Sequence, residues 1–213
     1  MRVIVTAGPT REYIDTVRFI TNSSSGKMGY AVAARAARAG HDVTLLSGQV
    51  ALATPPGCQR VQFTSVGDLA DALDERFTRC DALVMAAAVG DFRIDKPFPS
   101  KLRRKSGPVL LRLFPTDDIL ASLGHKKRPG QVVIAFAVED GTPEQIQEKA
   151  SGEMAAKNAD YVVMNTPSAM AADASLAAIL SRDGLLLGWD HRPKDDLAAE
   201  IVKLLSPQNP SPA

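Results

Sequence analysis

The sequence predicts an α/β fold in which a doubly wound, mostly parallel sheet lies between two layers of helices. Short β-branched runs alternate with amphipathic stretches, two runs (82–88 and 132–137) are apolar throughout, and Asp183-Gly184 separates two late apolar runs. Parallel strands covered on both faces are continuously apolar, and strands separated by helices imply right-handed βαβ units. The expected architecture is therefore a Rossmann-like three-layer sheet with a C-terminal antiparallel hairpin.

Apolar runs, helix caps and turn residues predict the individual elements. The helix after the first strand is expected to end at Gly40, since glycine is typical of helix C-termini. A later helix is expected to begin at Thr142, because Thr-Pro-Glu-Gln has the pattern of a capping box with proline at the first helical position. The expected strands cover 3–7, 41–47, 60–64, 82–88, 132–137 and 161–165, and the expected helices cover 25–39, 66–79, 143–158 and 193–205.

The chain has 213 residues, enough for one domain, which we expect over residues 1–206. Residues 90–114 form one long irregular segment, and such segments are usually functional or disordered. Within it, "KLRRK" (101–105) has four cations in five residues. We interpret 93–107 as a flexible flap that closes over a polyphosphate, with a solvated loop as the alternative. Residues 207–213 are expected to be a disordered tail.

Composition excludes several classes of function. The 25 Lys and Arg residues nearly balance the 24 Asp and Glu residues, which argues against nucleic-acid or membrane-surface binding. No apolar run approaches the roughly 20 residues of a membrane helix. The two cysteines form no CxxC motif, and the three histidines are scattered, which argues against a protein-held zinc ion. We expect a cytoplasmic protein with reduced cysteines.

The stretch "FITNSSSGKMG" (19–29) looks like a phosphate-binding loop but fails the Walker A pattern, because Thr21 and Met28 stand where glycine and a hydroxyl residue are required. The Rossmann dinucleotide fingerprint is also missing after the first strand. Ser23, Ser24 and Ser25 lie at the expected start of a helix, where free N–H groups favour an anion. An ordinary serine cap is an equally favoured alternative.

Other candidate residues follow the expected strands, at the edge where α/β proteins bind ligands. Arg18 and Asn22 lie after the first strand and suit a carboxylate, a phosphate or an oxyanion, although an ordinary hydrogen-bonded loop is preferred on these residues alone. Alanines 86–88 would let a ligand approach the backbone, and Asp91 follows them; alternatively, the alanines pack under a helix and Asp91 starts a turn. Lys157 is expected to point into the site or to belong to an exposed ion-paired helix face.

In this order, the motifs "VTAGPTREYIDTVRFITNSSSGKMGYAVA", "AAAVGDFR", "KLRR", "FAVED" and "KNADYVVMN" resemble phosphopantothenoylcysteine synthetase, also called phosphopantothenate–cysteine ligase. The resemblance covers nearly the whole chain. It implies a two-step ligation in coenzyme A synthesis: 4′-phosphopantothenate attacks CTP or ATP, and L-cysteine displaces the nucleotide from the acyl-nucleotidylate. Mg²⁺ would be held largely by the triphosphate rather than by protein side chains.

Roles implied by the resemblance are carried over residue by residue. Asn22, with Arg18, would attend the acyl-phosphate, and Ala88 and Lys101 would serve formation of the acyl-nucleotidylate. The remaining nucleotide contacts implied by the resemblance or by the loop's backbone are Ser24, Gly26, Ala86, Ala87, Asp91, Asp117, Asp118, Ile119, Leu120, Phe136 and Lys157. Family members dimerise, so 93–105 is expected to reach towards the partner's site.

In many bacteria, the family's domain is fused behind a flavin-dependent decarboxylase. The chain begins at the first strand, so we expect a stand-alone synthetase or an excised domain, with possible association with such a decarboxylase. Glu153 stands where the family commonly has lysine and is expected to pair with Lys157. Two alternatives stay open: a non-catalytic nucleotide-binding protein of the same fold, favoured by Glu153, and an NAD(P) oxidoreductase, disfavoured by the missing ribose-binding acid.

Overall fold

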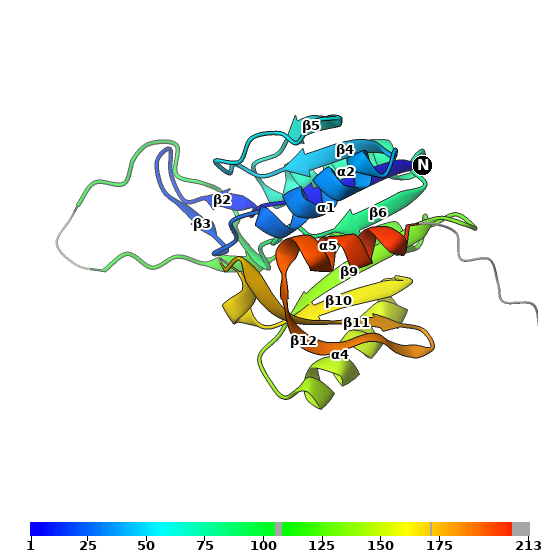
Figure 1. Ribbon diagram of the computed structural model, residues 1–213. Helices are drawn as coiled ribbons and strands as arrows, with labels where there is room; N and C mark the ends of the chain where they lie inside the picture. Colours follow the sequence, from blue (N-terminus) through cyan, green and yellow to red (C-terminus); the bar gives the residue numbers. More distant parts are fainter. Residues whose placement is uncertain (105–107, 171, 206–213) are drawn as a thin grey trace, which may run out of the picture.

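The computed structural model describes residues 1–104, 108–170 and 172–205. Its centre is an eight-stranded sheet (Figure 1). Neighbouring strands from β5 to β10 run parallel, and β11 and β12 add an antiparallel hairpin at one edge. In spatial order the strands are β12 (Gly184–Pro193), β11 (Ala174–Ser181), β10 (Tyr161–Asn165), β9 (Val132–Val138), β6 (Ala82–Met85), β1 (Arg2–Ala7), β4 (Asp42–Ser47) and β5 (Cys58–Gln62).

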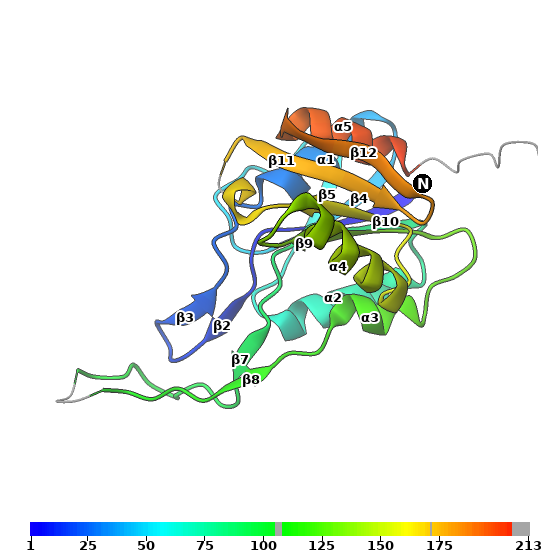
Figure 2. The same ribbon diagram turned by 90° about the horizontal axis from the view of Figure 1, so that it is seen from below.

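Helices cover both faces of this sheet (Figure 2). On one face lie α1 (Lys27–Arg38) and α5 (Lys194–Lys203), and on the other lie α2 (Val66–Phe77), α3 (Ile119–Gly124) and α4 (Pro143–Ala156). Alternate residues of β1 face opposite layers, so that Val3 and Val5 pack under α1 and α5 while Ile4 packs with α2. The predicted three-layer α/β fold with its C-terminal hairpin is confirmed.

Caps and close packing fix the helices. The predicted capping box at α4 is present, with Gln145 N–H donating to Thr142 Oγ1 and Thr142 N–H donating to Gln145 Oε1. Helix α1 approaches β1 so closely that a Cβ on Gly29 would lie 2.6 Å from Ala7 Cβ. Glycine is therefore required where this helix begins, directly behind the carboxyl end of β1.

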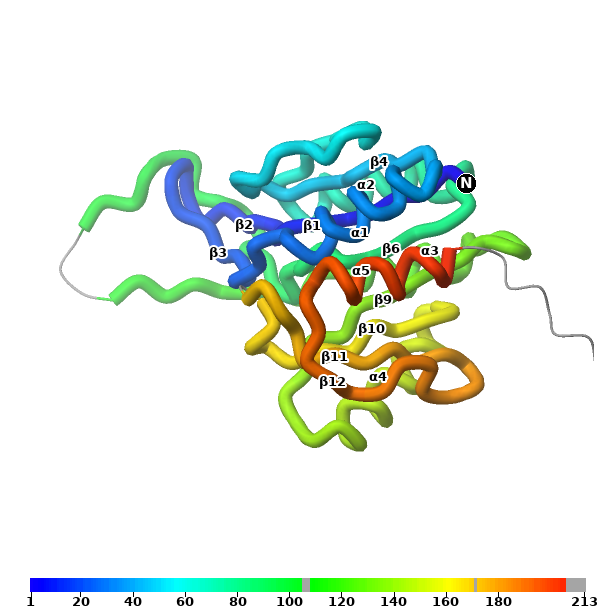
Figure 3. The backbone as a smooth tube through the Cα atoms, viewed as in Figure 1, coloured from blue at the N-terminus to red at the C-terminus, as the bar shows by residue number. Residues whose placement is uncertain are grey.

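Two narrow antiparallel ribbons extend from the body at the carboxyl end of the sheet (Figure 2), and the first of them also projects clearly in the tube view (Figure 3). The first consists of β2 (Arg11–Tyr13) and β3 (Phe19–Thr21), and the second of β7 (Phe92–Ile94) and β8 (Leu113–Pro115). The strands β2 and β7 are in contact, so the two ribbons form a common arm. Neither ribbon was predicted, and the segment 90–114 has strands near its two ends rather than being irregular throughout.

The predicted bounds differ from the structure mainly at the ends of elements. The largest difference concerns β6, which ends at Met85 and not at Ala88, because the ladder is interrupted at residues 86–87 and Ala88 makes only an isolated parallel bridge to Pro9. Two short helical elements, α3 and the 3₁₀ turn η1 (Pro167–Ala169), were also missed. Residues 105–107 of the expected flap and the expected tail lie outside the described residues.

Candidate active site

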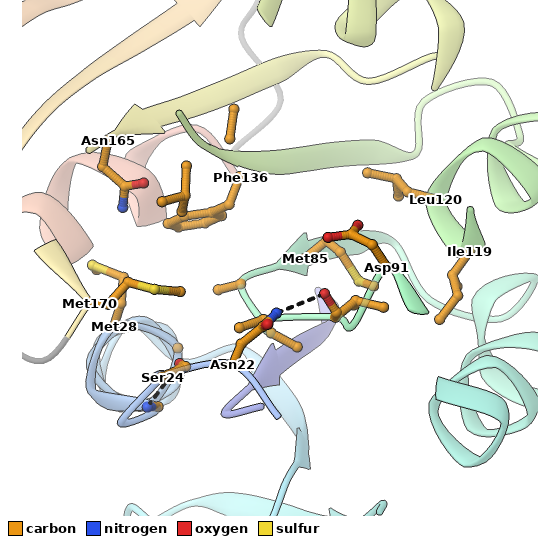
Figure 4. A pocket seen from close by; sticks show the side chains of 18 of the residues that line it. Asn22, Ser24, Met28, Met85, Asp91, Ile119, Leu120, Phe136, Asn165 and Met170 are labelled. Carbon is orange, nitrogen blue, oxygen red and sulfur yellow. Dashed lines mark hydrogen bonds between the residues drawn. The ribbon is translucent and has the colours of Figure 1, made fainter. Parts of the chain in front are cut away.

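A cleft of about 610 Å³ opens at the carboxyl ends of the central parallel strands (Figure 4). It is lined by residues that follow β3 and β6, by the last residues of β9 and β10, and by the facing ends of α1, α3 and α4. Parallel strands end at a common edge of the sheet, and α/β proteins bind ligands in the crevice outside the carboxyl ends of these strands. The cleft therefore lies where the sheet topology favours a ligand site.

Three alanines form the floor of this cleft. The segment from Ala86 to Ala88 is held by backbone bonds: Ala87 N–H donates to Thr6 Oγ1 over 2.9 Å, and Ala88 N–H donates to the Gly8 carbonyl over 3.0 Å. Thr10 Oγ1 accepts from Gly90 N–H in the same way. Because alanine side chains are short and the backbone is fixed, a bound group can approach this floor closely.

Asn22 lies on the floor, directly after the β2–β3 ribbon. Its Nδ2 donates to the Val89 carbonyl over 2.9 Å, which Figure 4 marks with a dashed line. This bond fixes the side chain and identifies the nitrogen side of the amide. One N–H and the Oδ1 acceptor stay available, so that Asn22 can donate to an oxyanion and accept from an amine.

The N-terminus of α1 faces the cleft from the adjacent wall. Its N-cap is Gly26, in the left-handed region at φ 77°, and no side chain caps the first turn. Ser24 Oγ accepts from Gly26 N–H instead. The interpretation of the serines as an ordinary helix cap is therefore wrong. The N–H groups of Lys27, Met28 and Gly29 have no partner within the helix, and such groups bind anions.

Phe136 and Asn165 lie at one end of the cleft, with Met28 and Met170 beside them in Figure 4. The Asn165 side chain, on a residue only 8% exposed, has an Oδ1 without a hydrogen-bond partner in the described part of the chain. Buried polar atoms are usually paired, so this oxygen is available to a bound donor. Asn165 was not among the predicted site residues. Its position as the last residue of a predicted strand is the same signal that identified Asp91 and the alanines.

The cleft carries more negative than positive side chains among the described residues. The acidic lining residues are Asp91, Asp117, Asp118, Glu139 and Glu153, and the basic ones are Lys27, Lys157 and Lys194. Lys157 Nζ lies 2.9 Å from Glu153 Oε2 and 3.5 Å from Asp118 Oδ2. Burial acts to lower the pKa of Lys157, but the two carboxylates outweigh it and raise that pKa. The predicted pairing of Glu153 with Lys157 is confirmed.

The other two lysines also have partners. Lys27 Nζ lies 2.6 Å from Asp173 Oδ1, an ion pair that links α1 to the segment before β11. The buried Lys194 ammonium donates to the carbonyls of Ala169 and Ala172, and burial lowers the pKa of Lys194. Two of the three lining lysines are therefore compensated by carboxylates, and the third is held by backbone carbonyls.

Thirteen of the fifteen predicted site residues line this one cleft. The two that do not are Arg18 and Lys101, which lie on the arm. Arg18 Nη1 donates to Asp15 Oδ2 over 2.6 Å and to the Leu102 carbonyl over 3.1 Å. The Lys101 side chain is exposed. Among the described residues there is no cluster of three or more His, Cys, Asp and Glu side chains with a geometry suited to a metal ion. Nor is any described helix both long and apolar enough to cross a membrane.

Comparison with known proteins identifies the family. Residues 1–207 match the family described as DNA/pantothenate metabolism flavoprotein C-terminal domain. The chain belongs to this family. It is 38% identical over 206 residues to the Coenzyme A biosynthesis bifunctional protein CoaBC of Bacillus subtilis, covering 94% of this chain and 50% of that protein. The chain thus spans about half the length of the curated relatives it matches.

Two solved structures extend the comparison. The C-terminal domain of a CoaBC protein aligns with a TM-score of 0.77 and 35% identity, covering 96% of this chain and 93% of that one. A Cab2 mutant in complex with phosphopantothenate-cysteine aligns with a TM-score of 0.79 at 18% identity, covering 96% of this chain and 86% of that chain. The second likeness concerns the fold alone. The family resemblance read from the sequence motifs is confirmed.

Proposed function

We propose that the chain is a phosphopantothenate–cysteine ligase that joins 4′-phosphopantothenate to L-cysteine through an acyl-nucleotidylate. The observation that carries the proposal is the juxtaposition of a fixed Asn22, an alanine floor and an uncapped helix N-terminus in one cleft. Membership of a family whose relatives include CoaBC gives the substrate class. The ligase reaction needs orientation and charge stabilisation rather than a side-chain nucleophile, and this cleft provides both.

In the first step, a carboxylate oxygen of phosphopantothenate attacks the α-phosphorus of the nucleotide, and the bond to the β-phosphate oxygen breaks to release pyrophosphate. The N–H groups at the start of α1 bind phosphate oxygens, and Phe136 contacts the base. In the second step, the cysteine amine attacks the acyl carbon, the bond from that carbon to the phosphate oxygen breaks, and the amine releases a proton to solvent. Asn22 donates to the acyl oxygen and accepts from the incoming amine.

The excess of carboxylates in the cleft indicates that a bound triphosphate needs cations from elsewhere. Five carboxylates and three lysines line it, and two of the lysines are in ion pairs, so a triphosphate needs further positive charge. Mg²⁺ bound to a triphosphate takes few ligands from the protein. The scattered carboxylates of this cleft, which form no group of three that could hold a metal ion among the described residues, suit such a Mg²⁺ ion. When bound on the triphosphate, Mg²⁺ would neutralise phosphate charge. Lys101 of the arm would add positive charge as pyrophosphate leaves, whereas Arg18 is already paired with Asp15.

We propose CTP rather than ATP as the nucleotide, on the family resemblance of the residues around Phe136 and Asp91. Both of these residues line the cleft. The discriminating measurement is competition between CTP and ATP in a binding assay with phosphopantothenate present. Preferential binding of ATP would overturn the choice of CTP and leave the ligase proposal intact.

We further propose a homodimer in which the flap of one subunit reaches the partner's cleft. Of eleven exposed large apolar side chains among the described residues, seven lie on the arm, and Leu110 is 92% exposed. Clustered exposed apolar groups mark interaction surfaces. The seven are Val17, Phe92, Phe98, Val109, Leu110, Leu111 and Leu113. A flavin-dependent decarboxylase, which would supply the other activity of bifunctional CoaBC relatives, is a second proposed neighbour.

Mixing two inactive variants tests the shared site. An Asn22→Asp chain and a Lys101→Ala chain each lack one required group. If the flap serves the partner's cleft, each mixed dimer contains one intact site, and random reassociation restores about one quarter of the wild-type activity. No restoration, although mass spectrometry detects mixed dimers, would contradict a shared site. A monomer by analytical ultracentrifugation would contradict the dimer itself.

The activity itself is tested by pyrophosphate release from CTP with phosphopantothenate and cysteine. Release that requires both the nucleotide and phosphopantothenate is expected. Folded protein that binds the nucleotide but releases no pyrophosphate, with CTP or ATP, would favour a non-catalytic nucleotide-binding protein. The Lys157–Glu153 pair is the observation that keeps this second candidate open.

The Asn22→Asp variant tests the assigned role within the ligase. Loss of one oxyanion-type donor typically costs about 10²–10³ in rate. We expect this loss in product formation, with pyrophosphate release slowed far less, so that acyl-nucleotidylate accumulates and can be trapped by rapid acid quench. Unchanged turnover would refute the role.

A further inference from the structure

The base of the flap is fixed to the tip of the β2–β3 ribbon by one buried carboxylate. Asp15 lies in the turn between β2 and β3, and its side chain is fully buried although the turn belongs to an arm outside the main body. Asp15 Oδ1 accepts the N–H groups of Val17 and Arg18, both over 2.7 Å. These two bonds form an ordinary local turn.

The second oxygen of this carboxylate makes contacts that the turn does not require. Asp15 Oδ2 accepts from Leu102 N–H over 3.0 Å and from Arg18 Nη1 over 2.6 Å. Arg18 Nη1 also donates to the Leu102 carbonyl over 3.1 Å. Leu102 is therefore held at both its N–H and its C=O by a pair of residues more than 80 positions earlier in the chain.

A second backbone bond completes the attachment. Phe98 N–H donates to the Ile14 carbonyl over 2.8 Å. The segment from Phe98 to Leu102 is thus fixed at its two ends, and Lys101 lies within it with its side chain exposed. A short segment held at both ends cannot shift along the ribbon without breaking one of these bonds.

The charge of Asp15 is permanent at physiological pH. Burial acts to raise the pKa of the Asp15 carboxyl, but the N–H groups of Leu102, Arg18 and Val17, together with the Arg18 guanidinium, lower that pKa to about 2. A carboxylate with donors on both oxygens is a rigid anchor, since each donor restricts its orientation. The same carboxylate orients Arg18 and the backbone next to Lys101, the two predicted cations that do not line the cleft.

We propose that Asp15 is a positioning residue that fixes Arg18 and Lys101 relative to each other for the formation of the acyl-nucleotidylate. The inference rests on the proposed ligase function for its kinetic part. Its structural part, the docking of residues 98–102 on the turn around Asp15, does not depend on the reaction. The two parts are therefore measured separately.

The test compares Asp15→Asn with Asp81→Asn. Asp81 is a matched control because it also accepts a backbone N–H and pairs with an arginine, Arg2, and its pKa is also about 2. It lies directly before β6, at the amino-terminal end of this strand, whereas the cleft lies at the carboxyl ends of the parallel strands. Hydrogen exchange followed by mass spectrometry reports docking of residues 98–102, and single-turnover pyrophosphate release without cysteine reports the first chemical step.

For Asp15→Asn we expect exchange at residues 98–102 to be at least about tenfold faster, with peptides from the central sheet unchanged. A displacement of about 1 Å in a positioned group can cost about 10²-fold in rate, so we expect the first step to slow by about 10- to 100-fold. The KM for the nucleotide should change little, because the cleft residues are untouched. Asp81→Asn should alter neither readout.

Leu102 provides a second pair of variants that leave Asp15 in place. Leu102→Pro removes the N–H that Asp15 accepts, whereas Leu102→Ala keeps it. Leu102→Pro should reproduce both effects of Asp15→Asn, and Leu102→Ala should show neither. An unchanged rate of hydrogen exchange at residues 98–101 in Leu102→Pro would overturn the docking of this segment. Faster exchange together with an unchanged rate of the first chemical step would overturn the positioning role of Asp15. Wild-type protein that releases no pyrophosphate would instead refute the ligase proposal while the exchange result stands.

Discussion

Replacing Gly29 by alanine tests how the fold builds the end of the cleft where we propose that phosphates bind. An added Cβ would lie 2.6 Å from Ala7 Cβ, 2.7 Å from the Thr6 carbonyl oxygen and 3.0 Å from Ala7 Cα, whereas ordinary van der Waals contact begins at 3.4 Å. Two of these three neighbours are backbone atoms of a central strand, which cannot move aside. The start of α1 must therefore shift away from β1 by several tenths of an ångström.

The expected cost follows from this overlap. Overpacking by one methyl group typically costs about 1–3 kcal/mol. For a domain of this size each kcal/mol lowers Tm by about 2–4 °C, so we expect Gly29→Ala to melt about 2–12 °C below the wild type. An anion at a helix N-terminus gains about 0.3–2 kcal/mol, so displacement of α1 should weaken nucleotide binding by about 2- to 30-fold.

Gly152→Ala is the matched control. Gly152 lies in the interior of α4, and an added Cβ there meets no atom within 4 Å. The substitution should stabilise the protein by up to about 1 kcal/mol, because alanine is the better helix former. Calorimetry gives the melting temperatures, and nucleotide titration gives the affinities. If Gly29→Ala has the melting temperature of the wild type, the packing argument is refuted. If it has a lower melting temperature but binds the nucleotide equally well, the role of the α1 N-terminus is refuted.

Two further predictions concern charge. Glu153→Gln, and more so Glu153→Lys, should tighten nucleotide binding, because Glu153 neutralises Lys157. A partly exposed ion pair is worth about 0.2–1 kcal/mol, so the nucleotide affinity of Glu153→Gln should rise by about 1.4- to 5-fold. Glu148→Gln on the same helix is the control, and equal affinities by titration would mean that Lys157 does not contact the phosphates. Asp81→Asn should flatten the acid dependence of the free energy of unfolding. Because hydrogen bonds from Arg2 lower the pKa of Asp81 to about 2, its contribution is complete above pH 4 and is lost as the pH falls towards 2. Denaturant titrations from pH 5 to 2.5 measure this, and parallel curves for the two proteins would contradict it.

Much of the architecture could be predicted because it depends on local patterns. Continuous apolar runs located β6 and β9, and the Thr142 capping box located the start of α4. The end of β6 was misplaced because Ala86 to Ala88 are as apolar as the strand before them. The ladder breaks there because Ala87 N–H donates to the Thr6 side-chain hydroxyl, and Ala88 then makes only an isolated bridge to Pro9. This is a tertiary effect that an apolar run does not reveal.

The arm could not be predicted for a related reason. Strands β2, β3, β7 and β8 have only three residues each and lack an apolar alternation that identifies a strand. Arg11 stacks on the Phe19 ring at 4.5 Å, and Glu12 accepts the N–H of Val66 at the start of α2. The contact of Glu12 with Val66, like that of Arg18 with Leu102, joins residues distant in sequence, so the chain alone did not indicate it.

The predicted residues divide into two groups with different positions, and the division has a kinetic consequence. Thirteen line the cleft, where the net charge of the lining opposes a triphosphate, while the two cations with the most solvent access, Arg18 and Lys101, lie on an arm positioned through Asp15. In the proposed reaction, groups on the body bind substrate before the chemical step, and charges on the arm act as phosphate charge shifts during pyrophosphate release. Changes at Phe136 or Asn165 should therefore appear mainly in nucleotide affinity, and changes at Asp15 or Lys101 mainly in the rate of the first step. Because exposed charges are screened by salt, the rate that depends on the arm should also fall more steeply with ionic strength than the affinity that depends on the cleft.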